Sequence, residues 1–319
     1  MSAATVFQTQ AKLRFDHADV LLFDPIFANR ATLRTSLEMV GFRRITVVSD
    51  LREIPELVHL HVVDLFVADV TQHTEKVCAL VRAMREGKAC ANPYLHVVLM
   101  AWKLDNEIVR HALNCGADEF VTRPFSGAFL GARIKASTES RPDFVVTGDY
   151  VGPDRRRDQL RRGDAPTFAA PNSMQAKCKE AYDPGHSPAA ILREIKAANA
   201  KVGTDRVRRS SIQIPQLVRR LKEAFTAMDP LEPGLVQLKT IAKDVAERAQ
   251  HAGAQAVLDI ATPLVKEIAG ALSGEHVAAH IDTVERLATE LYLAANPGCT
   301  LEHLKQEIER AQAAQGKRR

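Results

Sequence analysis

The stretch that decides the fold is Gly116-Ala117-Asp118-Glu119-Phe120-Val121-Thr122-Arg123-Pro124-Phe125. Residues 119–122 predict a short final strand, and Ser126 is placed to cap a helix that extends to about Lys135. The stretch closes a segment, residues 18–135, in which apolar strands alternate with amphipathic helices. This alternation predicts a parallel sheet that is covered by helices on both faces.

Five strands are expected in this segment, and a helix is expected after each of them. The predicted strands are residues 19–23, 45–48, 65–68, 95–100 and 119–122, and the predicted helices are residues 30–40, 51–60, 74–85, 106–115 and 126–135. We therefore expect an α/β fold with a doubly wound, five-stranded parallel sheet. In such sheets ligands bind beyond the carboxyl ends of the strands. The residues that map to that edge are Asp24, Asp69, Ala101 and Arg123.

The length and composition of the chain limit the class of protein to which it can belong. A chain of 319 residues, 46% hydrophobic and 26% charged, is long enough for two globular domains with sizeable cores. No apolar run approaches the roughly 20 residues that span a bilayer, and residues 1–12 lack the apolar core of a signal peptide. The five cysteines are scattered and form no CxxC pair, which is typical of reduced thiols. We expect a cytoplasmic protein without membrane insertion.

The segment and its ending resemble the receiver domain of response regulators, of the chemotaxis-regulator type, over about residues 18–134. In that family the last strand and turn usually read GA-[DN]-x-[FY]-[LIV]-x-K-P-[FI]. The resemblance implies a flavodoxin-like fold and assigns positions to three residues. Asp69 falls at the phosphate-acceptor position, Asp24 at the first of two acidic Mg²⁺ positions, and Phe120 at the position of the switch aromatic.

Four positions of the implied site differ from the family's pattern. Pro25 stands where the second acidic residue is expected and offers no side-chain oxygen. Ala101 replaces the hydroxyl residue, Trp102 follows where a small residue is usual, and Arg123 replaces the lysine. These changes matter because an aspartyl phosphate crowds negative charge, which Mg²⁺ and a lysine must neutralise.

Two interpretations of this site remain open. In the first, Asp69 is phosphorylated, Arg123 supplies the countercharge, and Asp24 and Asp69 hold Mg²⁺ weakly, although an arginine fork is not a point charge. In the second, the two aspartates are remnants paired with Arg123, and the domain is a rigid docking surface. The second is favoured because three supporting groups have changed at once. No Walker loop, dinucleotide fingerprint or nucleophile elbow is present, so we do not expect an enzyme.

A basic segment follows the receiver-like part. Residues 141–222 contain 17 Lys and Arg against 9 Asp and Glu. Residues 141–157 are similar to an extension of the form "RPFV…YFGPDRRR", which follows receiver domains in many alphaproteobacterial proteins. Its arginine cluster, Arg155, Arg156 and Arg157, is a candidate site for an anion, a nucleic acid or an acidic partner. The alternative is an extension that packs back on the receiver and leaves its arginines in solvent.

Changes of composition predict four parts of the chain. They are a tail over 1–17, the receiver-like domain over 18–138, a basic extension and linker over 139–214, and a helical bundle interaction domain over 215–319. One helix is expected inside the linker, at 188–200. In the last part apolar residues at helical spacing predict a small antiparallel bundle.

One stretch of the predicted bundle, residues 243–268, resembles a histidine-phosphotransfer domain. Gly253, Ala254 and Leu258 fit that pattern, whereas Lys243 stands where the phosphorylated histidine is expected. The resemblance therefore implies that phosphotransfer is not retained.

Together these features predict a signal-transduction protein that acts through protein–protein contacts in a two-component or phosphorelay pathway. The implied partners are a histidine kinase, a phosphotransfer protein or a downstream output protein. One alternative is a working response regulator that accepts phosphate on Asp69. Another is a binder of nucleic acid, through the basic linker and Arg219, Arg220 and Lys222, or of an anionic nucleotide second messenger, through the arginines of residues 155–162.

Overall fold

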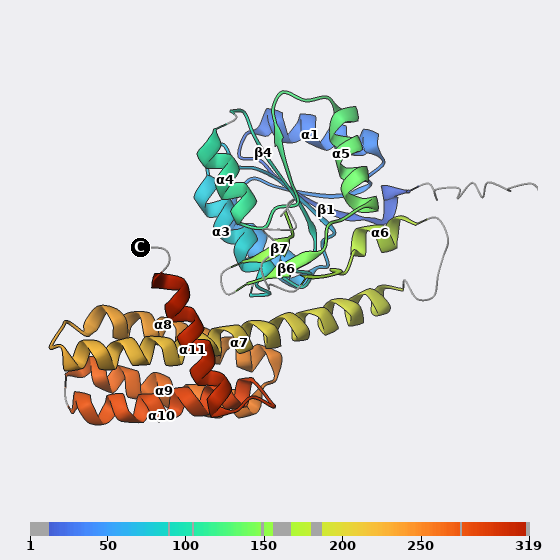
Figure 1. Ribbon diagram of the computed structural model, residues 1–319. Coiled ribbons are helices and arrows are strands. Elements are labelled where there is room, and N and C mark those ends of the chain that lie inside the picture. The colour runs from blue at the N-terminus through green and yellow to red at the C-terminus, as the bar shows by residue number, and fades with distance from the viewer. Residues whose placement is uncertain are drawn as a thin grey trace, which may run out of the picture. The chain divides into compact units, whose positions relative to one another are not determined.

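The computed structural model describes residues 13–88, 90–103, 105–147, 150–155, 167–179, 187–274 and 276–316 (Figure 1). The chain divides into two compact units, Met1–Ala198 and Asn199–Arg319. Among these described residues, no helix is long and apolar enough to cross a membrane.

The first unit is built on a five-stranded parallel sheet in the order β2-β1-β3-β4-β5. Its strands are β1 (Asp19–Phe23), β2 (Arg44–Val48), β3 (Leu65–Asp69), β4 (His96–Ala101) and β5 (Glu119–Thr122). This is the flavodoxin-like order: β2 is added on one side of β1, and β3, β4 and β5 are added on the other, so the direction of strand addition reverses at β1. The predicted α/β fold class is therefore confirmed.

Helices cover both faces of this sheet (Figure 1). They are α1 (Phe27–Val40), α2 (Ile54–Leu60, after the short helix η2, Leu51–Glu53), α3 (Thr74–Arg85), α4 (Asn106–Asn114) and α5 (Gly127–Glu139). Leu37 of α1 and Ile134 of α5 belong to one apolar cluster, whereas Val81 of α3 and Ala112 of α4 belong to a second. As predicted, the Ser126 side chain caps α5, accepting a hydrogen bond from the backbone N–H of Phe129 at 3.1 Å.

The extension after α5 is folded rather than a linker. It forms a three-stranded antiparallel sheet in the order β7-β6-β8, followed by a short helix; the elements are β6 (Phe144–Val146), β7 (Val151–Pro153), β8 (Thr167–Phe168) and α6 (Ser173–Cys178). The prediction of a linker over 139–214 is therefore wrong for this part. Its strands are only two or three residues long, so they carry no periodicity that a sequence could display.

A buried ion pair fixes the extension to the receiver-like part. Arg141 of the extension pairs at 2.9 Å with Asp118, which also pairs with Arg85 of α3 at 2.7 Å. Gly116 permits the close approach of β7, because a Cβ there would lie 2.8 Å from the carbonyl oxygen of Val151. The described residues of this extension therefore pack back on the receiver-like part, as the second of the two interpretations expected.

A second correction concerns the helix expected at 188–200. It is α7 (Pro188–Thr226), 39 residues long, and it runs through Pro215 and across the division between the two units. The boundary predicted at 214/215 therefore falls inside a helix. Buried apolar residues continue at helical spacing on both sides of this point, including Val207, Ile214 and Leu221.

The second unit is a helical bundle, as predicted. The rest of α7 is followed by α8 (Glu232–Ala252), α9 (Gln255–Ser273), α10 (Val277–Ala295) and α11 (Leu301–Gly316). One apolar cluster joins α7, α8, α9 and α10. Gly253 and Gly274 end α8 and α9 in the left-handed conformation, with φ of 69° and 83°, which allows short turns between consecutive helices.

Candidate functional site at the carboxyl edge of the sheet

The parallel topology brings the predicted site residues to one edge of the sheet. Asp24 follows β1, Asp69 ends β3, and Arg123 follows β5. Strands β1 and β3 are neighbours, and β5 is separated from β3 only by β4. All three side chains are buried at this edge.

Arg123 lies between the two aspartates. Its Nη2 donates a hydrogen bond to Asp24 Oδ2 at 2.8 Å, and its Nε lies 3.6 Å from Asp69 Oδ2. The sequence left open whether this arginine would serve as a countercharge for phosphate or pair with remnant carboxylates. In the structure its charge is already directed at both carboxylates.

Backbone groups hold the aspartates in place. Asp24 Oδ1 accepts a hydrogen bond from the N–H of Ile26 at 2.8 Å, and Asp69 Oδ1 accepts one from the N–H of Thr71 at 2.9 Å. Asp69 Oδ2 is buried and accepts no hydrogen bond from any residue that the structure describes. Asp69 thus keeps one oxygen without a hydrogen-bond donor, in the position where a phosphate acceptor was expected.

The electrostatic state of Asp24 reflects its burial. Removal from water raises the pKa of the Asp24 carboxyl, and the neighbouring charge of Asp69 raises it further. The Ile26 amide and Arg123 act in the opposite direction. Two carboxylates and one guanidinium leave this buried edge with a single net negative charge when all three are ionised.

Aromatic and sulfur groups surround the guanidinium. Its carbon lies 5.4 Å from the ring centroid of Trp102 and 6.0 Å from that of Phe125, distances typical of cation–π contacts. Nη2 also lies 3.1 Å from Met100 Sδ. Met100 and Phe125 were not predicted to belong to this site. Only their places in the chain, directly before Ala101 and two residues after Arg123, could have indicated it.

The other predicted positions behave differently. Ala101 is buried at the end of β4 and supplies no hydroxyl, and Trp102 after it is 47% exposed. The Thr71 hydroxyl accepts a hydrogen bond from the Trp102 backbone N–H at 3.3 Å. Phe120 is half-buried and packs against the core cluster of α3 and α4.

The residues present do not fit a Mg²⁺ ion. Both oxygens of Asp24 and one oxygen of Asp69 accept hydrogen bonds, and the remaining Asp69 oxygen faces a guanidinium that would repel a cation. Mg²⁺ demands near-octahedral oxygen ligands, and Pro25 offers none from its side chain. In the part of the chain that the structure describes, no group of three or more His, Cys, Asp or Glu side chains could hold a metal ion.

The arginine cluster of the extension is only partly described. Arg155 donates a hydrogen bond to the carbonyl oxygen of Ala117, so it joins the extension to the receiver-like part. Arg156 and Arg157 lie outside the described residues. One of the three candidate anion-binding residues thus has a structural contact.

Solved structures resemble the first unit. A response regulator from Thermotoga maritima shares 22% identity over 39% of this chain and 98% of its own, with a TM-score of 0.35. A chemotaxis protein of Vibrio cholerae shares 18% identity over 37% of this chain and 96% of its own, with a TM-score of 0.33. A receiver domain protein from Methanospirillum hungatei shares 18% identity over 38% and 92%, with a TM-score of 0.34.

At TM-scores this low the likenesses carry no argument of their own, and the fold rests on the strand order and connections described above. No protein-family model matches the chain, and no curated protein matches it.

Proposed function

We propose that this chain is a signal-transduction protein whose receiver-like domain is held in one state by Arg123 and acts through protein–protein contacts. On this proposal it belongs to a two-component or phosphorelay pathway, with another signalling protein as its partner, and it is not an enzyme. The flavodoxin-like strand order and the aspartates at the ends of β1 and β3 support a receiver-like role.

The observation that carries the proposal is the buried Arg123–Asp24 ion pair beside Asp69. For Asp69 to take up a phosphoryl group with Mg²⁺, the metal would have to displace Arg123 from Asp24 Oδ2. Mg²⁺ would therefore compete with a buried, hydrogen-bonded guanidinium for the same oxygen. Phosphorylation would also lack the hydroxyl that Ala101 does not supply.

Exposure of the full chain to acetyl phosphate or phosphoramidate with millimolar Mg²⁺ tests this proposal. Intact-mass measurement should show no gain of a phosphoryl group in the wild-type protein. Asp69→Asn serves as the control for modification elsewhere. A phosphoryl group that appears on the wild type and is absent from Asp69→Asn would overturn the proposal and make the chain a phosphorylatable regulator.

The nucleic-acid alternative receives less support from the basic residues near the end of α7. Arg219 pairs with Glu223 at 3.1 Å, and Lys222 pairs with Glu285 at 2.5 Å. Carboxylates of the protein therefore already neutralise two positive charges that would otherwise bind the phosphates of a nucleic acid. Retention on DNA that falls steeply with rising salt would argue for this alternative instead.

A further inference from the structure

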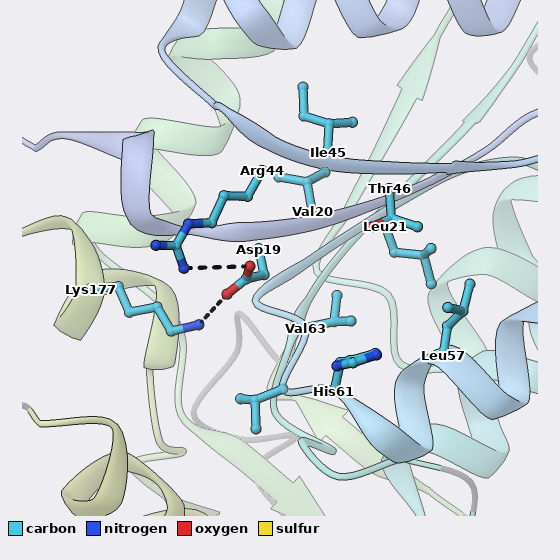
Figure 2. A pocket seen from close by; sticks show the side chains of 11 residues that line it. Asp19, Val20, Leu21, Arg44, Ile45, Thr46, Leu57, His61, Val63 and Lys177 are labelled. Atoms are coloured by element: carbon cyan, nitrogen blue, oxygen red, sulfur yellow. Dashed lines mark hydrogen bonds and ion pairs between the residues drawn. The ribbon is translucent and has the colours of Figure 1, made fainter.

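A pocket of about 370 Å³ opens at the amino-terminal end of β1 and β2, away from Asp69 (Figure 2). Three parts of the first unit contribute to its walls: the two strands, α2 with the loop that follows it, and α6 of the extension. The lining residues include Asp19, Arg44, Leu57, His61, Val63 and Lys177. Its volume lies within the range of small-molecule sites in proteins, about 300–1,000 Å³.

The extension fixes the charged end of this pocket. Lys177 of α6 lies 2.7 Å from Asp19 Oδ2 and 2.6 Å from Asp64 Oδ2, and Asp64 is buried. The ion pair with Lys177, drawn in Figure 2, holds the Asp19 carboxylate in one orientation at the pocket wall, and the pair with Asp64 holds Lys177 in place. The position of Asp19 is thus set by the protein before any ligand arrives, which lowers the entropic cost of binding.

The second oxygen of Asp19 and the guanidinium of Arg44 lie side by side. Asp19 Oδ1 and Arg44 Nη1 form an ion pair at 3.9 Å, a distance too long for a hydrogen bond (Figure 2). Among the described residues, neither Asp19 Oδ1 nor the Arg44 side chain, which is 57% exposed, makes a hydrogen bond. The pocket therefore offers one acceptor and one bidentate donor next to each other, joined only by this long ion pair.

Apolar side chains line the pocket beyond this charged pair. Leu57 of α2 and Val63 before β3 lie along it, as Figure 2 shows. Val63 is buried, so its position is held by the core. An aliphatic group placed here would lose contact with water and gain van der Waals contacts.

We propose that this pocket binds a small zwitterion of the amino-acid class with an aliphatic side chain. The ammonium group would donate to Asp19 Oδ1, the carboxylate would accept from Arg44, and the side chain would lie against Leu57 and Val63. Both head-group contacts are charge-assisted hydrogen bonds, which are the strong ones. The pocket shares no residue with the Asp24–Asp69–Arg123 site, so this inference stands apart from the proposed function.

Isothermal titration of the full chain with L-leucine, L-isoleucine and L-valine tests the proposal. At least one of them should give a saturable heat at millimolar or lower concentration. N-acetyl-L-leucine lacks the ammonium group and isoamylamine lacks the carboxylate, so each should bind about tenfold more weakly or worse. The proposal is overturned if none of the three amino acids binds, or if either analogue binds as tightly as leucine.

A pair of variants locates the site. Arg44→Gln removes the cation that would face the carboxylate and should weaken binding about tenfold or more. Arg34→Gln on α1, another exposed arginine, which pairs with Glu38 at 2.9 Å, is the matched control and should bind as the wild type does. Equal affinity of Arg44→Gln and wild type would place the ligand elsewhere and overturn the assignment.

Discussion

At the scale of single residues, Arg123 lies between the two buried carboxylates of the site. The guanidinium is planar and permanently charged, and here it contacts Asp24 with one nitrogen and approaches Asp69 with another. Cation–π contacts with Trp102 and Phe125 further limit its orientation. The side chain is thus held on several sides and is not free to follow an incoming phosphate.

Replacement of Arg123 should destabilise the first unit. We expect Arg123→Ala to lower the free energy of unfolding by about 3–5 kcal/mol at pH 7, because buried Asp24 would lose its cation. The loss should shrink as the pH is lowered, because burial raises the pKa of Asp24 and a carboxyl that has accepted a proton no longer needs a cation. Urea unfolding over a series of decreasing pH values measures this. A loss that stays the same throughout the series would contradict the role given to the ion pair.

Trp102, the only tryptophan, is a probe placed beside the site. We expect no change in its fluorescence with millimolar Mg²⁺, with or without beryllofluoride, because the residues around Asp69 do not fit the ion. A fluorimetric titration of wild type and Asp69→Asn in parallel checks this. A saturable change that disappears in Asp69→Asn would show that Asp24, Asp69 and Arg123 suffice for a working switch.

At the scale of elements, the start of β4 contacts the last turns of α5. His96, its first residue, is buried, and its Nε2 lies 3.2 Å from the carbonyl oxygen of Ser137. Burial, together with the charge of Arg141, lowers the pKa of His96 to about 3. At Asp118 burial would raise the pKa of the carboxyl, but the charges of Arg141 and Arg85 outweigh it and lower that pKa to about 2. The folded state therefore keeps a neutral imidazole beside an ionised carboxylate.

This arrangement predicts acid sensitivity between about pH 6.5 and about pH 3. An unfolded histidine binds a proton below about pH 6.5, whereas folded His96 does not until about pH 3, so stability should fall as the pH falls between these values. From pH 6.5 to pH 5 the expected loss is about 2 kcal/mol. Urea unfolding of wild type and His96→Gln over this range measures it. A slope that persists unchanged in His96→Gln would contradict the assignment.

At the scale of the whole molecule, the extension and the receiver-like part form one unit. The unit continues to Ala198, well beyond the predicted boundary at 138. Lys177 supplies the cation for buried Asp64, and Arg141 supplies one of the two cations for Asp118. A chain that ends at 138 would leave both carboxylates short of positive charge in a buried environment.

Two truncations test this unity. The fragment of residues 13–179 should unfold cooperatively, and the fragment of residues 13–138 should be much less stable or fail to fold, because it lacks Arg141 and Lys177. Thermal unfolding followed by circular dichroism compares the two. If they melt within about 4 °C of each other, a loss of several kcal/mol is excluded and the extension is not part of the folding unit.

Local sequence patterns determined the architecture of the sheet. The strands of residues 18–135 are apolar runs of four to six residues, the helices between them show helical spacing, and right-handed crossovers then leave few ways to arrange them. The edge shared by Asp24, Asp69 and Arg123 follows from that arrangement, because each residue lies where a parallel strand ends. Ser126 as the cap of α5 needed no more than its place before the helix.

Only the tertiary structure shows which partners these residues have and that the extension is folded. Whether Arg123 would face a phosphate or the two carboxylates depended on side-chain geometry, which periodicity does not carry. Lys177 lies 158 residues from Asp19 and 113 residues from Asp64 along the chain, so no local sequence pattern predicts its contacts with them. Strands of two or three residues, such as β8, are stable only through what they pack against, so their existence could be learned only from the folded chain.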